Sequence, residues 1–160
     1  MEKVQQRIRN HMKQVIFKLG EEEYGLDIGL VDAIEKHTGV IHVPNAPTCI
    51  KGIMDFRGEV IPVYSLRRKF GLPEKEIDKN TMLIVTKSKG ILMGYEVDEV
   101  KEILEIPEAS ISNPPTIIKN SNTSYIQLVA NIDNRMVILL DHDGIISSSE
   151  KENIETLVLN

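Results

Sequence analysis

An internal repeat constrains the fold of this 160-residue chain more than any other feature of its sequence. The segment Gly94–Ile103 can be laid over Gly25–Ile34. Both follow the order glycine, apolar, acidic, β-branched, two variable residues, valine, two variable residues, isoleucine. Further along, the apolar–turn–apolar segment Tyr125–Leu140 aligns with Ile50–Val63. A repeat of roughly 70 residues is too long for a solenoid unit and fits a small β-subdomain. We therefore expect two related subdomains.

The local patterns within the repeat are those of short strands. Val15–Leu19 and Met82–Thr86 are rich in β-formers, and each is followed by a turn that contains glycine. In the segment Ile50–Val63, two apolar runs flank a turn in which Gly58 can adopt a positive φ, so this segment is predicted to be a hairpin. Closing such strands into barrels removes free sheet edges. The sequence therefore predicts an all-β fold of two small barrels.

The expected domain boundaries follow the repeat. Residues 1–14 form a flexible or weakly helical tail, and residues 15–146 form one domain. Its two subdomains span approximately 15–78 and 79–146, and strand exchange between them is possible. The remaining residues, 147–160, form a C-terminal segment in which spaced isoleucine and leucine residues allow a short helix.

Composition excludes several classes of protein. The 19 basic and 24 acidic residues give a net charge of −5, which lacks the basic footprint that a phosphate backbone requires. No apolar run approaches the ~20 residues of a membrane-spanning helix. The single cysteine, Cys49, excludes an intramolecular disulfide and suits a reducing compartment. We expect a cytoplasmic protein with no direct membrane insertion and no nucleic-acid partner; a small nucleic-acid-binding β-barrel is the alternative.

A search for catalytic chemistry gives no candidate. The chain has no glycine-rich phosphate loop and no nucleophile elbow, and no histidine near Cys49 in the sequence activates it. His142 lies in an Asp-His-Asp-Gly stretch that is typical of a turn and lacks the further ligands of a calcium loop. We therefore predict no enzymatic activity, no catalytic residues, no metal site and no cofactor. An enzyme would instead require titratable groups assembled in a pocket by the fold.

The strongest candidate for a functional surface is the predicted hairpin Ile50–Val63. It is nearly continuous in apolar residues, so one face must be covered by the rest of the protein or by a partner. Gly52 allows close approach of another backbone, and Arg57 at the turn is suited to anchor an interface. The alternative is that Arg57 is an ordinary solvated turn residue. From its residues, the chain is best interpreted as a binding module.

Several segments, in the right order, resemble the CheW family of chemotaxis adaptors. The resemblance covers roughly residues 15–146, and its strongest part centres on Phe56-Arg57-Gly58-Glu59. The segments that carry it are Phe17–Ile28, Ile50–Arg67, Ile103–Pro107 and Arg135–Asp141. The resemblance implies two small five-stranded barrels, SH3- or OB-like, packed as pseudo-repeats.

The resemblance also implies a function. CheW-like adaptors have no enzymatic activity, bind the regulatory domain of a CheA-type histidine kinase, and bind the cytoplasmic signalling tip of chemoreceptors. They couple the two in arrays on the inner face of the membrane, where ring-forming self-association is possible. A related scaffold of another chemosensory or twitching-motility pathway is an alternative within the family.

Three receptor-facing positions carry over by this resemblance: Val31, Gly52 and Arg57. Val31 would contribute apolar surface, Gly52 would permit close packing, and Arg57 would make polar contacts at the rim. The chain departs from the family pattern at two places. Ala33 stands where many members have glutamate, which removes a charge, and Asp55 adds one before the turn. We expect Asp55 to pair with Arg57 or with a neighbouring lysine.

Overall fold

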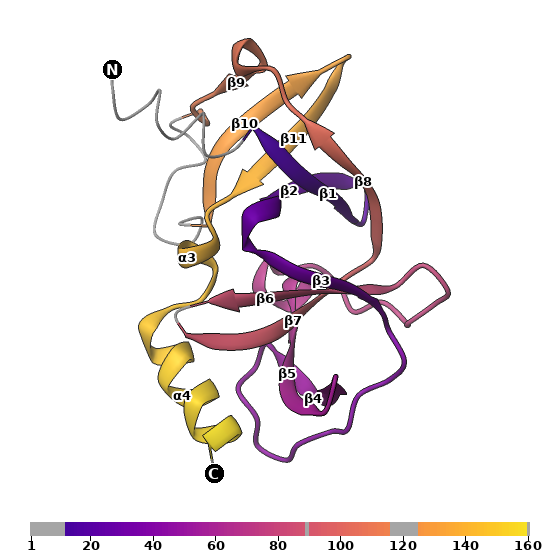
Figure 1. The fold of residues 1–160 in the computed structure, drawn as a ribbon, viewed down its shortest axis with the longest axis vertical. Helices are drawn as coiled ribbons and strands as arrows, with labels where there is room; N and C mark the ends of the chain where they lie inside the picture. Colours follow the sequence, from indigo (N-terminus) through magenta and orange to yellow (C-terminus); the bar gives the residue numbers. More distant parts are fainter. Residues whose placement is uncertain (1–11, 89, 116–124, 160) are drawn as a thin grey trace. The chain divides into compact units, whose positions relative to one another are not determined.

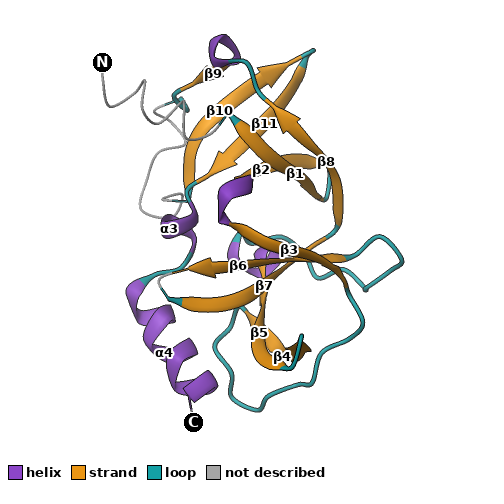
Figure 2. Cartoon of the chain, viewed as in Figure 1, coloured by secondary structure: helices purple, strands orange, loops and turns teal. Residues whose placement is uncertain are grey.

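The computed structural model describes residues 12–88, 90–115 and 125–159. Strands dominate the fold, as Figures 1 and 2 show. The chain divides into two compact units, each made of two separate pieces of sequence. Unit 1 comprises Met1–Leu30 and Val100–Ile145, and unit 2 comprises Val31–Glu99 and Ile146–Asn160.

Unit 1 is built on a sheet with the strand order β8-β1-β2-β11-β10-β9. The pairing of β11 with β2 is parallel, whereas β1–β2, β10–β11 and β10–β9 are antiparallel. Inward-facing side chains of several strands form its core, a cluster of Ile16, Ile106, Ile111, Leu128, Ala130, Val137 and Leu139. The elements are β1 (Lys13–Leu19), β2 (Glu22–Asp27), η1 (Ile28–Leu30), β8 (Glu99–Glu105), η2 (Glu108–Ser110), β9 (Ile111–Ser112), β10 (Ile126–Ile132), β11 (Arg135–Leu140) and α3 (His142–Ile145).

Unit 2 is built on a five-stranded sheet with the order β3-β6-β7-β5-β4. Its single parallel pairing joins β5 to β7. The core cluster contains Met54, Phe56, Ile61, Val63, Leu83 and Val85. The elements are β3 (Val31–Lys36), β4 (Ile50–Phe56), β5 (Glu59–Ser65), α2 (Leu66–Lys69), β6 (Met82–Ser88), β7 (Ile91–Val97) and α4 (Ser148–Leu159).

The internal repeat is confirmed by the strand order and by the pairing register. The two sheets have the same strand order when equivalent strands of the repeats are matched: β8-β1-β2-β11-β10 in unit 1 corresponds to β3-β6-β7-β5-β4 in unit 2. Only the two-residue strand β9 of unit 1 has no counterpart in the unit 2 sheet. The parallel pairs correspond as well: Leu139 lies opposite Gly25, and Val63 lies opposite Gly94. Both β10 and β4 carry a bulge at the equivalent place. The all-β prediction is confirmed.

The division of the chain differs from sequential halves. The expected boundary lay between residues 78 and 79, with strand exchange allowed. In the structure β3 follows β2 along the chain but pairs with β6, and β8 follows β7 but lies beside β1. Each sheet therefore joins the first two strands of one repeat to the remaining strands of the other. This exchange makes unit 1 discontinuous, and the C-terminal segment from Ile146 adds a second piece to unit 2.

Both chain ends bear on further expectations. Residues 1–11 of the expected tail lie outside the described residues, and β1 begins at Lys13, inside the expected tail. The helix expected in the C-terminal segment is α4. It begins with a capping box: Ser147 Oγ accepts from Glu150 N–H, and the Glu150 carboxylate accepts from Ser147 N–H, each at 3.1 Å.

Candidate partner-binding site

The β4–β5 hairpin ends in a two-residue turn formed by Arg57 and Gly58. Both residues have positive φ, 51° and 85°, and Phe56 pairs directly with Glu59 across the turn. Two positive φ values are the mark of a type I′ turn, whose twist matches that of the flanking strands. Gly58 adopts this conformation readily. The predicted hairpin is thus confirmed, and its geometry projects Arg57 from the tip.

The Arg57 side chain is 70% exposed and held by two weak contacts. Its Nη2 donates to Glu35 Oε1 at 3.4 Å, and its Cζ lies 4.8 Å from the centroid of the Phe56 ring. Glu35 belongs to β3, so this contact links the hairpin tip to the opposite edge strand of the same sheet. An ion pair this exposed contributes about 0–1 kcal/mol, so Arg57 does little for the stability of the fold.

The expected pairing of Asp55 is wrong. Arg57 contacts Glu35 instead, because its side chain leans over the inward-facing Phe56 ring and away from the outer face that carries Asp55. In the part of the chain that the structure describes, Asp55 is exposed and makes no ion pair.

Gly52 is buried, and the space beside it is filled by the chain itself. A β-carbon at this position would collide with the backbone carbonyl of Ile41. Ile41 and Ile53 exchange two backbone hydrogen bonds of 2.9 Å, which clamp the segment after β3 onto the edge of β4. The close backbone approach expected at Gly52 therefore exists, and within this structure Ile41 makes it.

Val31 begins β3, half-buried, and lies opposite Thr86. Ala33 packs against the unit 2 core, so the site of the missing glutamate faces inward at its β-carbon. Four residues beyond Val31 on the same strand, Glu35 holds Arg57. Arg57 thus contacts β3, the strand that also carries Val31. Gly52, in contrast, is covered by the backbone of Ile41.

A buried polar cluster in unit 2 was missed by sequence reasoning. The Glu96 carboxylate, about 10% exposed, accepts from His37 Nε2 and from Lys51 Nζ, each at 2.9 Å. His37 Nδ1 accepts from Gly39 N–H at 3.1 Å. Burial raises the pKa of Glu96, whereas the hydrogen bonds and positive charges of His37 and Lys51 lower it. The lowering outweighs the effect of burial, so the pKa of Glu96 is below its usual value. This cluster ties the end of β3 and the beginning of β4 to β7.

Glu150 is a second hub in unit 2. Besides capping α4, its carboxylate accepts from Tyr64 Oη at 2.8 Å and from Lys69 Nζ at 2.7 Å. These bonds fasten the first turn of α4 to β5 and α2. The spacing of Ser147 and Glu150 in the sequence could have predicted the capping box. The contacts of Glu150 with Tyr64 and Lys69 could not be predicted, because these residues are distant in the sequence.

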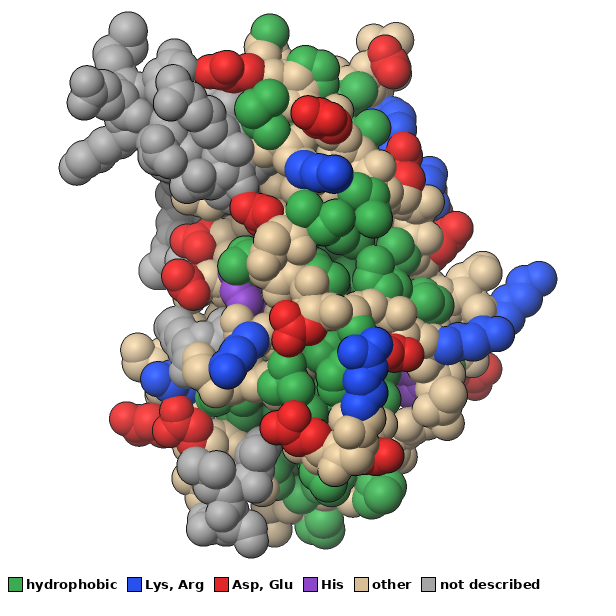
Figure 3. All heavy atoms as spheres, in the orientation of Figure 1, with side chains coloured by type: hydrophobic (Ala, Val, Ile, Leu, Met, Phe, Trp, Pro, Cys, Tyr) green, Lys and Arg blue, Asp and Glu red, His purple; other side chains and the backbone are tan. Residues whose placement is uncertain are grey.

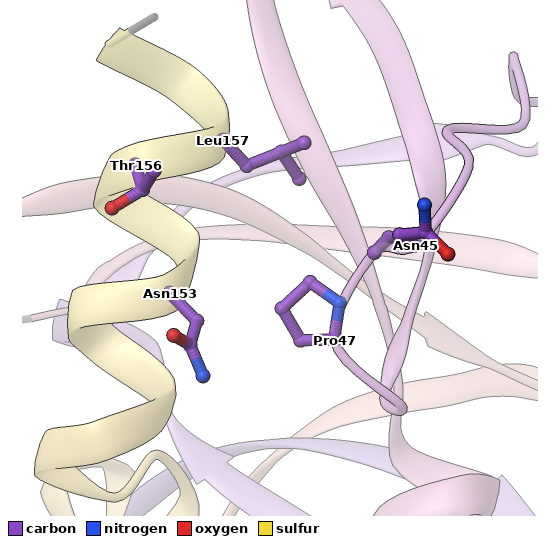
Figure 4. A pocket seen from close by; sticks show the side chains of 6 residues that line it. Asn45, Pro47, Asn153, Thr156 and Leu157 are labelled. Atoms are coloured by element: carbon purple, nitrogen blue, oxygen red, sulfur yellow. The ribbon is translucent and has the colours of Figure 1, made fainter.

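Beside the second half of α4 lies a cavity of about 360 Å³. Figure 4 shows Asn153, Thr156 and Leu157 of the helix on one side, with Asn45 and Pro47 on the other. No charged side chain lines it among the described residues. Its lining suits contact with uncharged groups.

Cys49 and His142, the side chains considered for catalysis or metal binding, are both buried in the fold. Cys49 is buried, and this burial raises the pKa of its thiol, which keeps it protonated and unreactive. Burial likewise lowers the pKa of His142, against the opposing effect of Asp143 and Asp141. Among the described residues no group of three His, Cys, Asp or Glu side chains has a metal-binding arrangement.

The surface shows a mixture of charges. On the face in Figure 3, Lys and Arg side chains are interspersed with Asp and Glu and with green apolar side chains. No described helix is long and apolar enough to cross a membrane.

Comparison with known proteins agrees with this architecture. The family model of the CheW-like domain matches residues 13–150. The chemotaxis protein CheW of Klebsiella aerogenes is 33% identical over 143 residues, which cover 89% of this chain and 86% of that protein. The CheW of Bacillus subtilis is 27% identical over 146 residues, covering 91% and 94%.

A solved structure extends the likeness to three dimensions. The scaffolding protein TtCheW from Thermoanaerobacter tengcongensis superposes with a TM-score of 0.77 at 31% identity, covering 88% of this chain and 90% of that one. A match over most of the chain, in both sequence and fold, identifies the family. The chain belongs to the CheW-like domain family.

Proposed function

We propose that this protein is a non-catalytic adaptor that couples chemoreceptors to a CheA-type histidine kinase in chemotaxis. The observation that carries the proposal is the CheW-like match over residues 13–150, together with a fold shared with a protein described as a scaffold. Its partners are the regulatory domain of the kinase and the cytoplasmic signalling tip of a receptor. It works in the cytoplasm, at receptor arrays on the inner face of the membrane.

The receptor-facing surface lies on β3 and the β4–β5 tip of unit 2. Val31 contributes half-buried apolar area, and Arg57 offers exposed hydrogen-bond donors. Gly52 acts from behind the surface: by admitting Ile41, it sets the path of the segment after β3 and the placement of the hairpin. Val31 and Arg57 therefore contact the partner, and Gly52 positions them.

Coupling requires contacts that differ between kinase states. An adaptor that binds both states of the kinase equally shifts nothing, however tightly it binds. The adaptor holds receptor and kinase in one geometry, so that a shift of the receptor changes which kinase state is favoured. A rigid surface suits this role. In unit 2 the buried bonds of Glu96 and Glu150 supply that rigidity around the hairpin.

The proposal is tested by kinase autophosphorylation. The purified protein is mixed with the kinase and a receptor cytoplasmic fragment, and the phosphorylation rate is measured with and without it. Receptor control of the kinase that depends on this protein is the expected result. Binding to neither partner, with an unchanged rate, would leave the protein with the family's fold and another role.

The site is tested with Arg57→Ala in the same assay. The variant is expected to bind the receptor fragment about tenfold or more weakly, as interface arginines often do, with unchanged thermal stability. Lys79→Ala, which removes an exposed positive charge from the 73–80 loop of the same unit, is the matched control. Normal kinase activation by Arg57→Ala would remove Arg57 from the site.

A further inference from the structure

The two units treat the arginine at their hairpin tips differently. In unit 1, Arg135 follows the β10–β11 turn and is clamped: Nη2 and Nε reach Glu23 at 2.5 and 3.2 Å, and Nη2 also reaches Glu102 at 3.1 Å. In unit 2, Arg57 has a single, longer contact with Glu35. The contacts of Arg135 link three strands of unit 1, whereas most of the N–H donors of Arg57 are left for a partner to bind.

The guanidinium of Arg57 is oriented by its neighbours, but most of its hydrogen-bond donors are unused among the described residues. It carries five N–H donors in a planar fork, and Glu35 takes one of them, on Nη2. The Phe56 ring lies against one side of it. Within the described residues no other acceptor approaches this group at hydrogen-bond distance. The Glu35 carboxylate and the Phe56 ring therefore orient the remaining donors together.

Glu35 also sets Arg57 relative to the other proposed contact. Glu35 pairs with Leu83 on β6, and Val31 pairs with Thr86, so both are fixed by the same strand pairing. A bulge between Val31 and Ala33 lets these four residues of β3 span three residues of β6, or about 10 Å, and turns the Val31 side chain to the face opposite that of Glu35. Because Arg57 lies in the turn that follows β4, the far edge strand, only the Glu35 contact ties its guanidinium to β3 among the described residues.

We infer that Glu35 is a positioning residue for receptor recognition: it holds Nη2 of Arg57 so that the unused donors of the fork face the partner. This inference rests on the proposed function. Ala33 supplies no carboxylate on β3, and the carboxylate that reaches the hairpin tip comes from Glu35 instead. The partner group that meets Arg57 is then a hydrogen-bond acceptor beside the hairpin tip.

The test is a double-mutant cycle in the full-length protein. Dissociation constants for the receptor cytoplasmic fragment are measured for wild type, Glu35→Gln, Arg57→Ala and the double variant, by isothermal titration calorimetry. Glu35→Gln keeps the shape of the side chain and removes its charge. It is expected to weaken binding about two- to fivefold, the range that corresponds to an exposed ion pair. In the Arg57→Ala background the same change is expected to have no effect.

Two further measurements separate positioning from a structural role. Raising the salt from about 0.05 to 0.5 M is expected to shrink the effect of Glu35→Gln, because exposed charge pairs are screened. Asp32→Asn, on the exposed adjoining position of β3, is the matched control and is expected to bind as wild type. Thermal midpoints of all variants are measured alongside to establish that they are folded.

The outcomes are distinguishable. If Glu35→Gln binds as wild type, or weakens binding equally with and without Arg57, the positioning role is overturned while the proposed function stands. If Arg57→Ala itself has no effect on binding, the proposed contact site fails, and the inference fails with it.

Discussion

The backbone carbonyl of Ile41 occupies the space that a β-carbon at Gly52 would need. The equivalent position in unit 1 is Leu128, which also follows the bulge and pairs with the equivalent strand, opposite Leu139. Leu128 is fully buried in its core. The repeat has therefore diverged here: one unit fills the space with a side chain, and the other fills it with the chain segment after β3.

Gly52→Ala is predicted to destabilise the protein by about 1–3 kcal/mol, because the new methyl group forces backbone apart rather than a flexible side chain. Chemical denaturation measures the change. Gly94→Ala is the control, since its β-carbon would find its nearest neighbour at 3.7 Å, an ordinary contact. A Gly52→Ala protein as stable as wild type, yet weaker in receptor binding, would place Gly52 in direct contact with the partner.

Glu96→Gln is predicted to cost about 3 kcal/mol, because it leaves the largely buried Lys51 ammonium without its counter-charge. Urea unfolding followed by circular dichroism gives the free energy. Glu74→Gln breaks a more exposed pair with Arg68 and is expected to cost less than about 1 kcal/mol. Equal losses for the two variants would contradict the structural weight given to the Glu96 cluster.

The free energy of unfolding is predicted to fall in acid partly through Glu150. Burial raises the pKa of Glu150, but the bonds from Lys69, Ser147 N–H and Tyr64 outweigh it, so its pKa in the folded protein is lowered. A carboxyl with a lowered folded pKa stabilises the protein above its unfolded pKa and loses this contribution as the pH falls through the folded value. The loss therefore begins near pH 4.5.

Glu150→Gln isolates this contribution. The variant is expected to be less stable than wild type at pH 7, and its free energy of unfolding is expected to fall less steeply between pH 5 and pH 3. Urea titrations at several pH values measure both quantities. Parallel curves for the two proteins would show that Glu150 keeps an ordinary pKa on folding.

His142 is predicted to make stability depend on pH at a higher range. Burial lowers its pKa in the folded protein, with Asp143 and Asp141 opposing. Below the unfolded value, 6.5, the unfolded chain binds the proton more readily, so the free energy of unfolding decreases as the pH falls from about 7 to 5. His142→Asn is expected to flatten this part of the profile. His42→Asn, at an exposed position, is the control and should leave it unchanged.

Those parts of the fold that depend on near neighbours were predictable from the sequence. Gly58 and the two apolar runs around it predict the β4–β5 hairpin, since turn geometry and strand alternation are set within a few residues. The spacing of Gly25–Ile34 and Gly94–Ile103 predicts two related β-units for the same reason. The choice of Val31, Gly52 and Arg57 as receptor contacts stays a prediction that comes from family resemblance.

Only the tertiary structure decided which distant residues meet. Glu96 binds His37 and Lys51 across 59 and 45 residues of chain, and Arg57 reaches Glu35 across 22. These contacts depend on the exchange that pairs β3 with β6, and on the register of each pairing. A shift of one residue turns every side chain of a strand to the other face, so local sequence does not determine such contacts. For this reason the sequence led us to expect a pairing of Asp55 with Arg57, whereas in the structure Arg57 contacts Glu35.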